Sequence, residues 1–175
     1  MRNIAIIALL LACVSVAGNA GNRKEFDLMK QENMKMKDKA EIYLAGGCFW
    51  GTEHFLKQIR GVEQTEVGYA NSQVPNPTYK EVCTGNTGAV ETVKVVYDPR
   101  TVDLDLLLDL YFQTIDPTSV NRQGGDSGLQ YRTGIYYIDK DDAPVIEAAI
   151  KDLAKDYAKP IAIEAVSYTH LRAHE

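Results

Sequence analysis

The chain has 175 residues, of which 45% are hydrophobic and 25% are charged. This size and balance fit one soluble globular domain with short flanking segments. The formal net charge of −5 and the sequence pI near 5.3 exclude the basic surface that nucleic-acid-binding proteins carry. No glycine-rich phosphate-binding motif is present in the sequence either, which argues against a nucleotide-dependent enzyme.

Residues 1–20 have the features of an export leader. Arg2 supplies the positive start, and the apolar run 4–12 is too short to span a bilayer but fits a secretory core. Two processing sites compete: Gly18-Asn19-Ala20 is a small-x-small cleavage pattern, and Leu10-Leu11-Ala12-Cys13 resembles a bacterial lipobox. We favour the lipoprotein, in which Cys13 is lipid-modified. Either route predicts a mature domain outside the cytoplasm, periplasmic or membrane-anchored, or otherwise secreted.

The remaining chain is predicted to hold a charged tether over 21–40 and one folded segment over 41–165. Apolar residues at spacing two predict strands, and apolar residues at spacing three to four predict helices. The expected strands are 41–45, 62–70, 89–97, 134–138 and 160–165, and the expected helices are 51–60, 103–115 and 142–157. Two long loops, 71–88 and 116–133, separate these elements. We expect an α+β fold with two helices on one face of a mostly antiparallel sheet.

Cys48 lies in the run Gly46-Gly47-Cys48-Phe49-Trp50-Gly51, between an expected strand and an expected helix. A thiol at a helix start is close to unpaired backbone N–H groups and to the positive end of the helix dipole. Both favour the thiolate, which is the nucleophilic form. The alternative is a small buried thiol with no chemistry, which is common for free cysteine.

Glu91 is the second candidate for chemistry. In the strand 89–97, alternate side chains share a face, so Glu91 shares its face with Ala89, Val93, Val95 and Tyr97. A carboxyl group on an apolar face loses hydration, which favours its protonated form and suits it to act as an acid. The alternative is a glutamate at the sheet edge that reaches water.

An ordered series of motifs resembles one known family. The matching segments are 46–51, 75–79, 81–85, 88–97, 116–117 and 123–137. Together they resemble the A-class peptide methionine sulfoxide reductases, over roughly residues 42–164. The resemblance implies a ferredoxin-like, two-layer α+β sandwich, which agrees with the class expected from periodicity.

The resemblance also implies a role for each matching residue. Cys48 corresponds to the nucleophile, which attacks the sulfur of methionine S-sulfoxide, releases methionine and becomes a sulfenic acid. Glu91 corresponds to the acid that protonates the sulfoxide oxygen. Tyr79 and Tyr131 correspond to phenols that hydrogen-bond this oxygen. Asp126 corresponds to an organising carboxylate near the cysteine.

Phe49 and Trp50 correspond to the walls that hold the S-methyl group of the substrate. These side chains have simpler interpretations. Aromatic pairs are usually core, Tyr79 and Tyr131 fit ordinary loop tyrosines, and Asp126 fits an Asx turn. We take the functional interpretation because the motifs match jointly and in order.

Turnover requires a thiol to resolve the sulfenic acid. The resemblance implies no bound cofactor or metal, with thioredoxin or another dithiol as external reductant and oxidised proteins and peptides as substrates. Cys83 is predicted to be a semi-buried inert thiol. Many relatives carry the resolving cysteine in a C-terminal tail that is not visible here. His54 is predicted to point away from Cys48, which argues against a Cys–His hydrolase.

Residues 166–175 are predicted to be a non-native tail, so that the reductase domain is truncated at its C-terminal end. Whether a fused B-class reductase domain follows in the natural protein is left open by the sequence. Two other functions also stay open. One is a thiol enzyme that reduces peroxide, and the other is a non-catalytic lipoprotein that keeps the fold.

Overall fold

The computed structural model describes residues 39–167 and the backbone of 172–173. Its contacts divide the chain into residues 1–37 and 38–175. The predicted leader with Cys13, and nearly all of the predicted tether, lie outside the described residues. Within the described part, no helix has the length and apolar character needed to cross a membrane.

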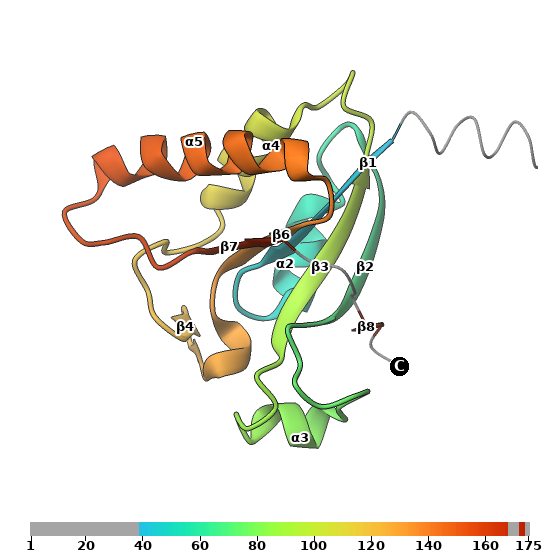
Figure 1. Cartoon of the computed structure of the whole chain (residues 1–175), viewed down its shortest axis with the longest axis vertical. Helices are drawn as coiled ribbons and strands as arrows, with labels where there is room; N and C mark the ends of the chain where they lie inside the picture. Colours follow the sequence, from blue (N-terminus) through green and yellow to red (C-terminus); the bar gives the residue numbers. More distant parts are fainter. Residues whose placement is uncertain (1–38, 168–171, 174–175) are drawn as a thin grey trace, which may run out of the picture. The chain divides into compact units, whose positions relative to one another are not determined.

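A mixed sheet forms one layer of the described fold (Figure 1). Its strands, in spatial order, are β7 (Glu164–Ser167), β6 (Gly134–Tyr137), β1 (Ala40–Ala45), β3 (Val90–Tyr97), β2 (Val62–Ala70) and β8 (Arg172–Ala173). Neighbouring strands are antiparallel except for β6 and β7, which run parallel. The predicted α+β, two-layer class with a mostly antiparallel sheet is confirmed.

Helices cover one face of this sheet. They are α2 (Phe49–Leu56), α4 (Leu104–Phe112) and α5 (Ala143–Leu153). The long loops hold the short elements α3 (Tyr79–Cys83), β4 (Arg122–Gln123), β5 (Asp126–Ser127) and η1 (Leu129–Tyr131). Two further 3-10 turns, η2 (Lys140–Asp142) and η3 (Ala154–Asp156), flank α5. Figure 1 shows α3 beyond the ends of β2 and β3, away from α4 and α5.

The main core lies between the sheet and the helices. The predicted alternation in β3 is confirmed, because the row from Ala89 to Tyr97 faces this core and Glu91 is buried among it. Each fully buried aliphatic side chain in such a core contributes about 1.5–3 kcal/mol relative to an exposed one. The opposite sheet face has a smaller buried cluster, which includes Tyr43, Val90 and Tyr136.

Several element boundaries differ from the predicted ones. The first helix begins at Phe49 rather than at residue 51, because Cys48 has an extended backbone and acts as its N-cap. The loop 71–88 contains α3, and three helices rather than two contribute to the main core. The last strand begins at Glu164 and continues past residue 165.

Candidate active site

Cys48 lies at the junction between β1 and α2. Its carbonyl oxygen accepts hydrogen bonds from the N–H groups of Gly51 and Thr52, at 3.1 and 3.3 Å, which closes the first helical turn. The thiol makes no capping hydrogen bond to the helix and is partly buried against the core. The sulfur is therefore placed at the helix start without being used to hold the helix.

The two glycines before Cys48 allow neighbouring segments to approach it closely. A Cβ atom at Gly46 would lie 2.6 Å from the Ile115 side chain, and one at Gly47 would lie 2.7 Å from Gln123. Gly47 also has a φ of +80°, which other residues rarely adopt. Gln123 is held in turn, because its side-chain amide exchanges two 2.8 Å hydrogen bonds with the backbone of Asp116.

Glu91, on β3, contacts the start of α2. Its side chain is 2% exposed, and its Oε2 accepts a 3.0 Å hydrogen bond from the N–H of Phe49, the first residue of α2. Burial raises the pKa of Glu91, the Phe49 N–H lowers it, and the negative charge of Asp126 raises it, with a net upward shift. The carboxyl group thus satisfies one free N–H of the helix start while its neutral form is favoured.

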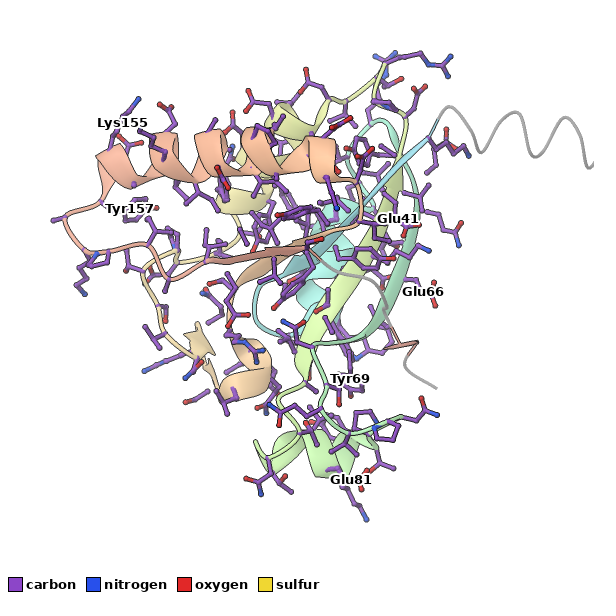
Figure 2. The ribbon with its side chains drawn as sticks, viewed as in Figure 1. Glu41, Glu66, Tyr69, Glu81, Lys155 and Tyr157 are labelled. Atoms are coloured by element: carbon purple, nitrogen blue, oxygen red, sulfur yellow. The ribbon has the colours of Figure 1, made fainter. Side chains whose placement is uncertain are left out.

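The charge of Glu91 raises the pKa of three phenols, those of Tyr69, Tyr79 and Tyr131. Tyr69 is the register partner of Glu91 on β2, is 3% exposed and packs against Phe49 with ring centroids 5.9 Å apart. Burial raises the pKa of Tyr69 to about 12, with further contributions from Glu91, Cys83, Tyr79 and Tyr131. Figure 2 shows Tyr69 at the end of the sheet that faces α3. Tyr69 was missed in the sequence, although its alternation with Val67 in the strand 62–70 would have placed it on the core face.

Tyr79 and Tyr131 come from the two long loops. A hydrogen bond to the Cys83 sulfur, together with the charge of that sulfur, raises the pKa of Tyr79 to about 12. Burial raises the pKa of Tyr131, and the charges of Glu91 and Asp126 raise it further. The charge of Glu91 thus contributes to the raised pKa of both predicted tyrosines.

The remaining predicted site residues also lie here. Phe49 is 3% exposed and makes an edge-on contact with Trp50, with ring centroids 5.2 Å apart, whereas Trp50 is 59% exposed. Asp126 is exposed on β5 and acts on Glu91 through its charge. No group of three or more metal-ligating side chains is arranged to bind a metal within the described residues.

Two residues that were not predicted to belong to the site, His54 and Cys83, are both exposed. His54 is exposed on α2. Cys83, the last residue of α3, is exposed rather than semi-buried, and its sulfur is a hydrogen-bond partner of Tyr79.

Known proteins resemble this chain in sequence and in fold. The family model described as peptide methionine sulfoxide reductase matches residues 40–175. The chain belongs to this family, in its A class. The peptide methionine sulfoxide reductase MsrA of Lachnoclostridium phytofermentans is 57% identical over 129 residues, which cover 74% of this chain and 78% of that protein.

Solved structures of the family have the same fold. Methionine sulfoxide reductase A of Corynebacterium diphtheriae is 35% identical, with a TM-score of 0.70 over 79% of this chain and 71% of that one. Reduced Mxr1 of Saccharomyces cerevisiae is 32% identical, with a TM-score of 0.74 over 79% and 81%. Mxr1 in complex with Trx2 matches at 22% identity and a TM-score of 0.60, over 79% and 83%. The chain is thus an oxidoreductase of the family that reduces methionine sulfoxide.

Proposed function

We propose that Cys48 reduces the S epimer of methionine sulfoxide, free or within proteins, with Glu91 as the acid. The observation that carries the proposal is the hydrogen bond from Phe49 N–H to the buried Glu91 carboxyl group, one residue from the nucleophile. This bond fixes a carboxyl group of raised pKa against the start of the helix that Cys48 caps. Oε2 accepts this bond, so a proton on Oε1 is the one available for transfer.

The Cys48 thiolate attacks the sulfoxide sulfur while Glu91 gives its proton to the sulfoxide oxygen. An S–S bond forms between Cys48 and the substrate as the S–O bond breaks and the oxygen leaves as hydroxide. Hydroxide then attacks the Cys48 sulfur and breaks the S–S bond. Methionine leaves with its sulfur reduced by two electrons, and Cys48 is oxidised by two electrons to a sulfenic acid. Protonation is required because an unprotonated oxide is a poor leaving group.

The other site residues have supporting roles in this proposal. Tyr79 and Tyr131 hydrogen-bond the sulfoxide oxygen, and Asp126 organises the polar side of the site. Phe49 and Trp50 hold the S-methyl group of the substrate. The exposure of Trp50 supports this role. A thioredoxin-like dithiol then returns Cys48 to its reduced state, and the complex of the relative Mxr1 with Trx2 supports this class of partner.

The test is a single-turnover assay with the separate S and R epimers of a methionine sulfoxide peptide, run on protein that has been reduced with dithiothreitol and then freed of it. We expect about one methionine per Cys48 from the S epimer and almost none from the R epimer. Cys48→Ser should abolish the reaction, and Glu91→Gln should slow it by about 10²–10⁴-fold, the usual contribution of a general acid. Failure to release methionine from the S epimer would refute the proposal.

We also propose that the chain works outside the cytoplasm as a lipoprotein. The support is the leader pattern that ends in Leu10-Leu11-Ala12-Cys13. In a bacterial host, the full chain should be found in the membrane fraction, and Cys13→Ala should release it from that fraction. A cytosolic product with an intact leader would contradict the proposal.

A further inference from the structure

Arg132 joins three segments of the fold through one guanidinium group. Its Nε donates to Glu164 Oε1 at 2.8 Å, its Nη1 to the carbonyl of Leu129 at 2.9 Å, and its Nη2 to the carbonyl of Gly88 at 3.1 Å. The side chain is 14% exposed. A planar fork of donors suits such a junction, because it fixes the angles between its acceptors as well as their distances.

Two of these acceptors lie just before residues of the candidate active site. Leu129 begins η1, which ends at Tyr131. Gly88 is the last residue of the 71–88 loop and precedes Glu91 by three positions. Gly88 also turns the chain into β3 with a φ of +69°. Arg132 therefore links the backbone segment that precedes Tyr131 to the backbone segment that precedes Glu91.

The third acceptor gives this junction a rigid anchor. Glu164 Oε2 accepts a 3.1 Å hydrogen bond from the Tyr136 hydroxyl, and the Glu164 N–H donates to the Thr133 carbonyl at 3.1 Å. Glu164 is also the register partner of Gly134 in the parallel pair of β6 and β7. A partly buried, doubly held carboxylate loses less side-chain entropy on pairing than a surface one, so its ion pair is stronger.

We propose that Arg132, anchored by Glu164, is a positioning residue that sets the spacing between the Tyr131 phenol and the Glu91 carboxyl group. This inference rests on the function proposed above. Arg132 acts through placement, because the pKa of Glu91 is set by its burial, by the Phe49 N–H and by Asp126. The sulfoxide oxygen must meet a hydrogen-bond donor and a proton donor at once, so the distance between them matters in the transition state.

The test is a double-mutant cycle of Arg132→Lys with Tyr131→Phe, read out in single turnover on the S epimer. Lysine keeps the charge but not the fork. We expect Arg132→Lys to lower the first-turnover rate constant about 10–100-fold, the range for an ångström-scale misplacement. The peptide dissociation constant should change less than about 3-fold. In the Tyr131→Phe variant, adding Arg132→Lys should lower the first-turnover rate constant by less than about 3-fold, because both changes remove the same alignment.

Arg122→Lys is the matched control. Arg122 lies in the same loop, is exposed and donates only a local bond to the Gly124 carbonyl. We expect it to react at the wild-type rate. If Arg132→Lys unfolds the protein, Glu164→Gln and Glu164→Ala replace it in the cycle. Glutamine keeps one acceptor oxygen at this position and alanine keeps none, so we expect the smaller loss for glutamine and the same non-additivity with Tyr131→Phe.

The outcomes separate the two proposals. An active wild type in which the effects of Arg132→Lys and Tyr131→Phe multiply would overturn the positioning role alone. So would a wild-type rate in Arg132→Lys, or an equal loss in Arg122→Lys. A wild type that does not reduce the S epimer would overturn the proposed function, and this inference with it.

Discussion

Glu91 shows how a single residue is held in a state that water would not favour. Its neighbours on the strand row are apolar, so its charge is poorly solvated, and Asp126 adds repulsion. The Phe49 N–H works in the opposite direction but does not cancel the effect. Since the folded protein favours the protonated form more than the unfolded chain does, folding and protonation of Glu91 are linked.

This linkage predicts how stability depends on pH. The folded-state pKa of Glu91 lies above its unfolded value of about 4.3. Its contribution is therefore fully present below pH of about 4.3 and is lost as pH rises through the folded pKa. The side chain of the Glu91→Gln variant cannot ionise. The free energy of unfolding of this variant, relative to that of wild type, should therefore rise with pH across this window and then stay constant. Urea unfolding of both proteins from pH 4 to pH 8 measures the difference. A pH-independent difference would contradict the linkage.

At the scale of elements, the short helix α3 depends on its cap. Five residues are too few for a helix that is stable by itself. Thr78 and Glu81 form a reciprocal capping box, in which each side chain bonds the backbone N–H of the other residue. Because α3 carries Tyr79, the cap orders part of the candidate active site as well as the loop.

Thr78→Ala should therefore loosen α3 without unfolding the molecule. The lost cap costs about 1 kcal/mol locally. We expect faster amide hydrogen exchange in α3, an increase of about 2–5-fold in KM for a sulfoxide peptide, and little change in melting temperature. Ser72→Ala is the control, since Ser72 bonds only to Val74 in the same exposed loop. Unchanged exchange and KM in Thr78→Ala would show that the cap does not order Tyr79.

For the whole molecule, the sequence predicted what depends on local pattern. The apolar row of β3 and the inward side chains of α4 repeat at strand and helix spacing, so both elements were recovered to within a few residues. The helix α3 was not, because five polar and mixed residues show no period. Gln123 and Arg132 were also missed as supports. Their partners lie up to 44 residues away, and spacing does not reveal such contacts.

The central place of β1 has a consequence for how the chain is made. This strand leaves the ribosome first among the described elements, yet its two neighbours are β3 and β6. Until residue 137 has been synthesised, at least one edge of β1 has no partner, and an open edge invites wrong pairing. Long-range pairing of this kind slows folding. Cys48, which follows β1 at the start of α2, is therefore set in a complete sheet only after residue 137 has been synthesised.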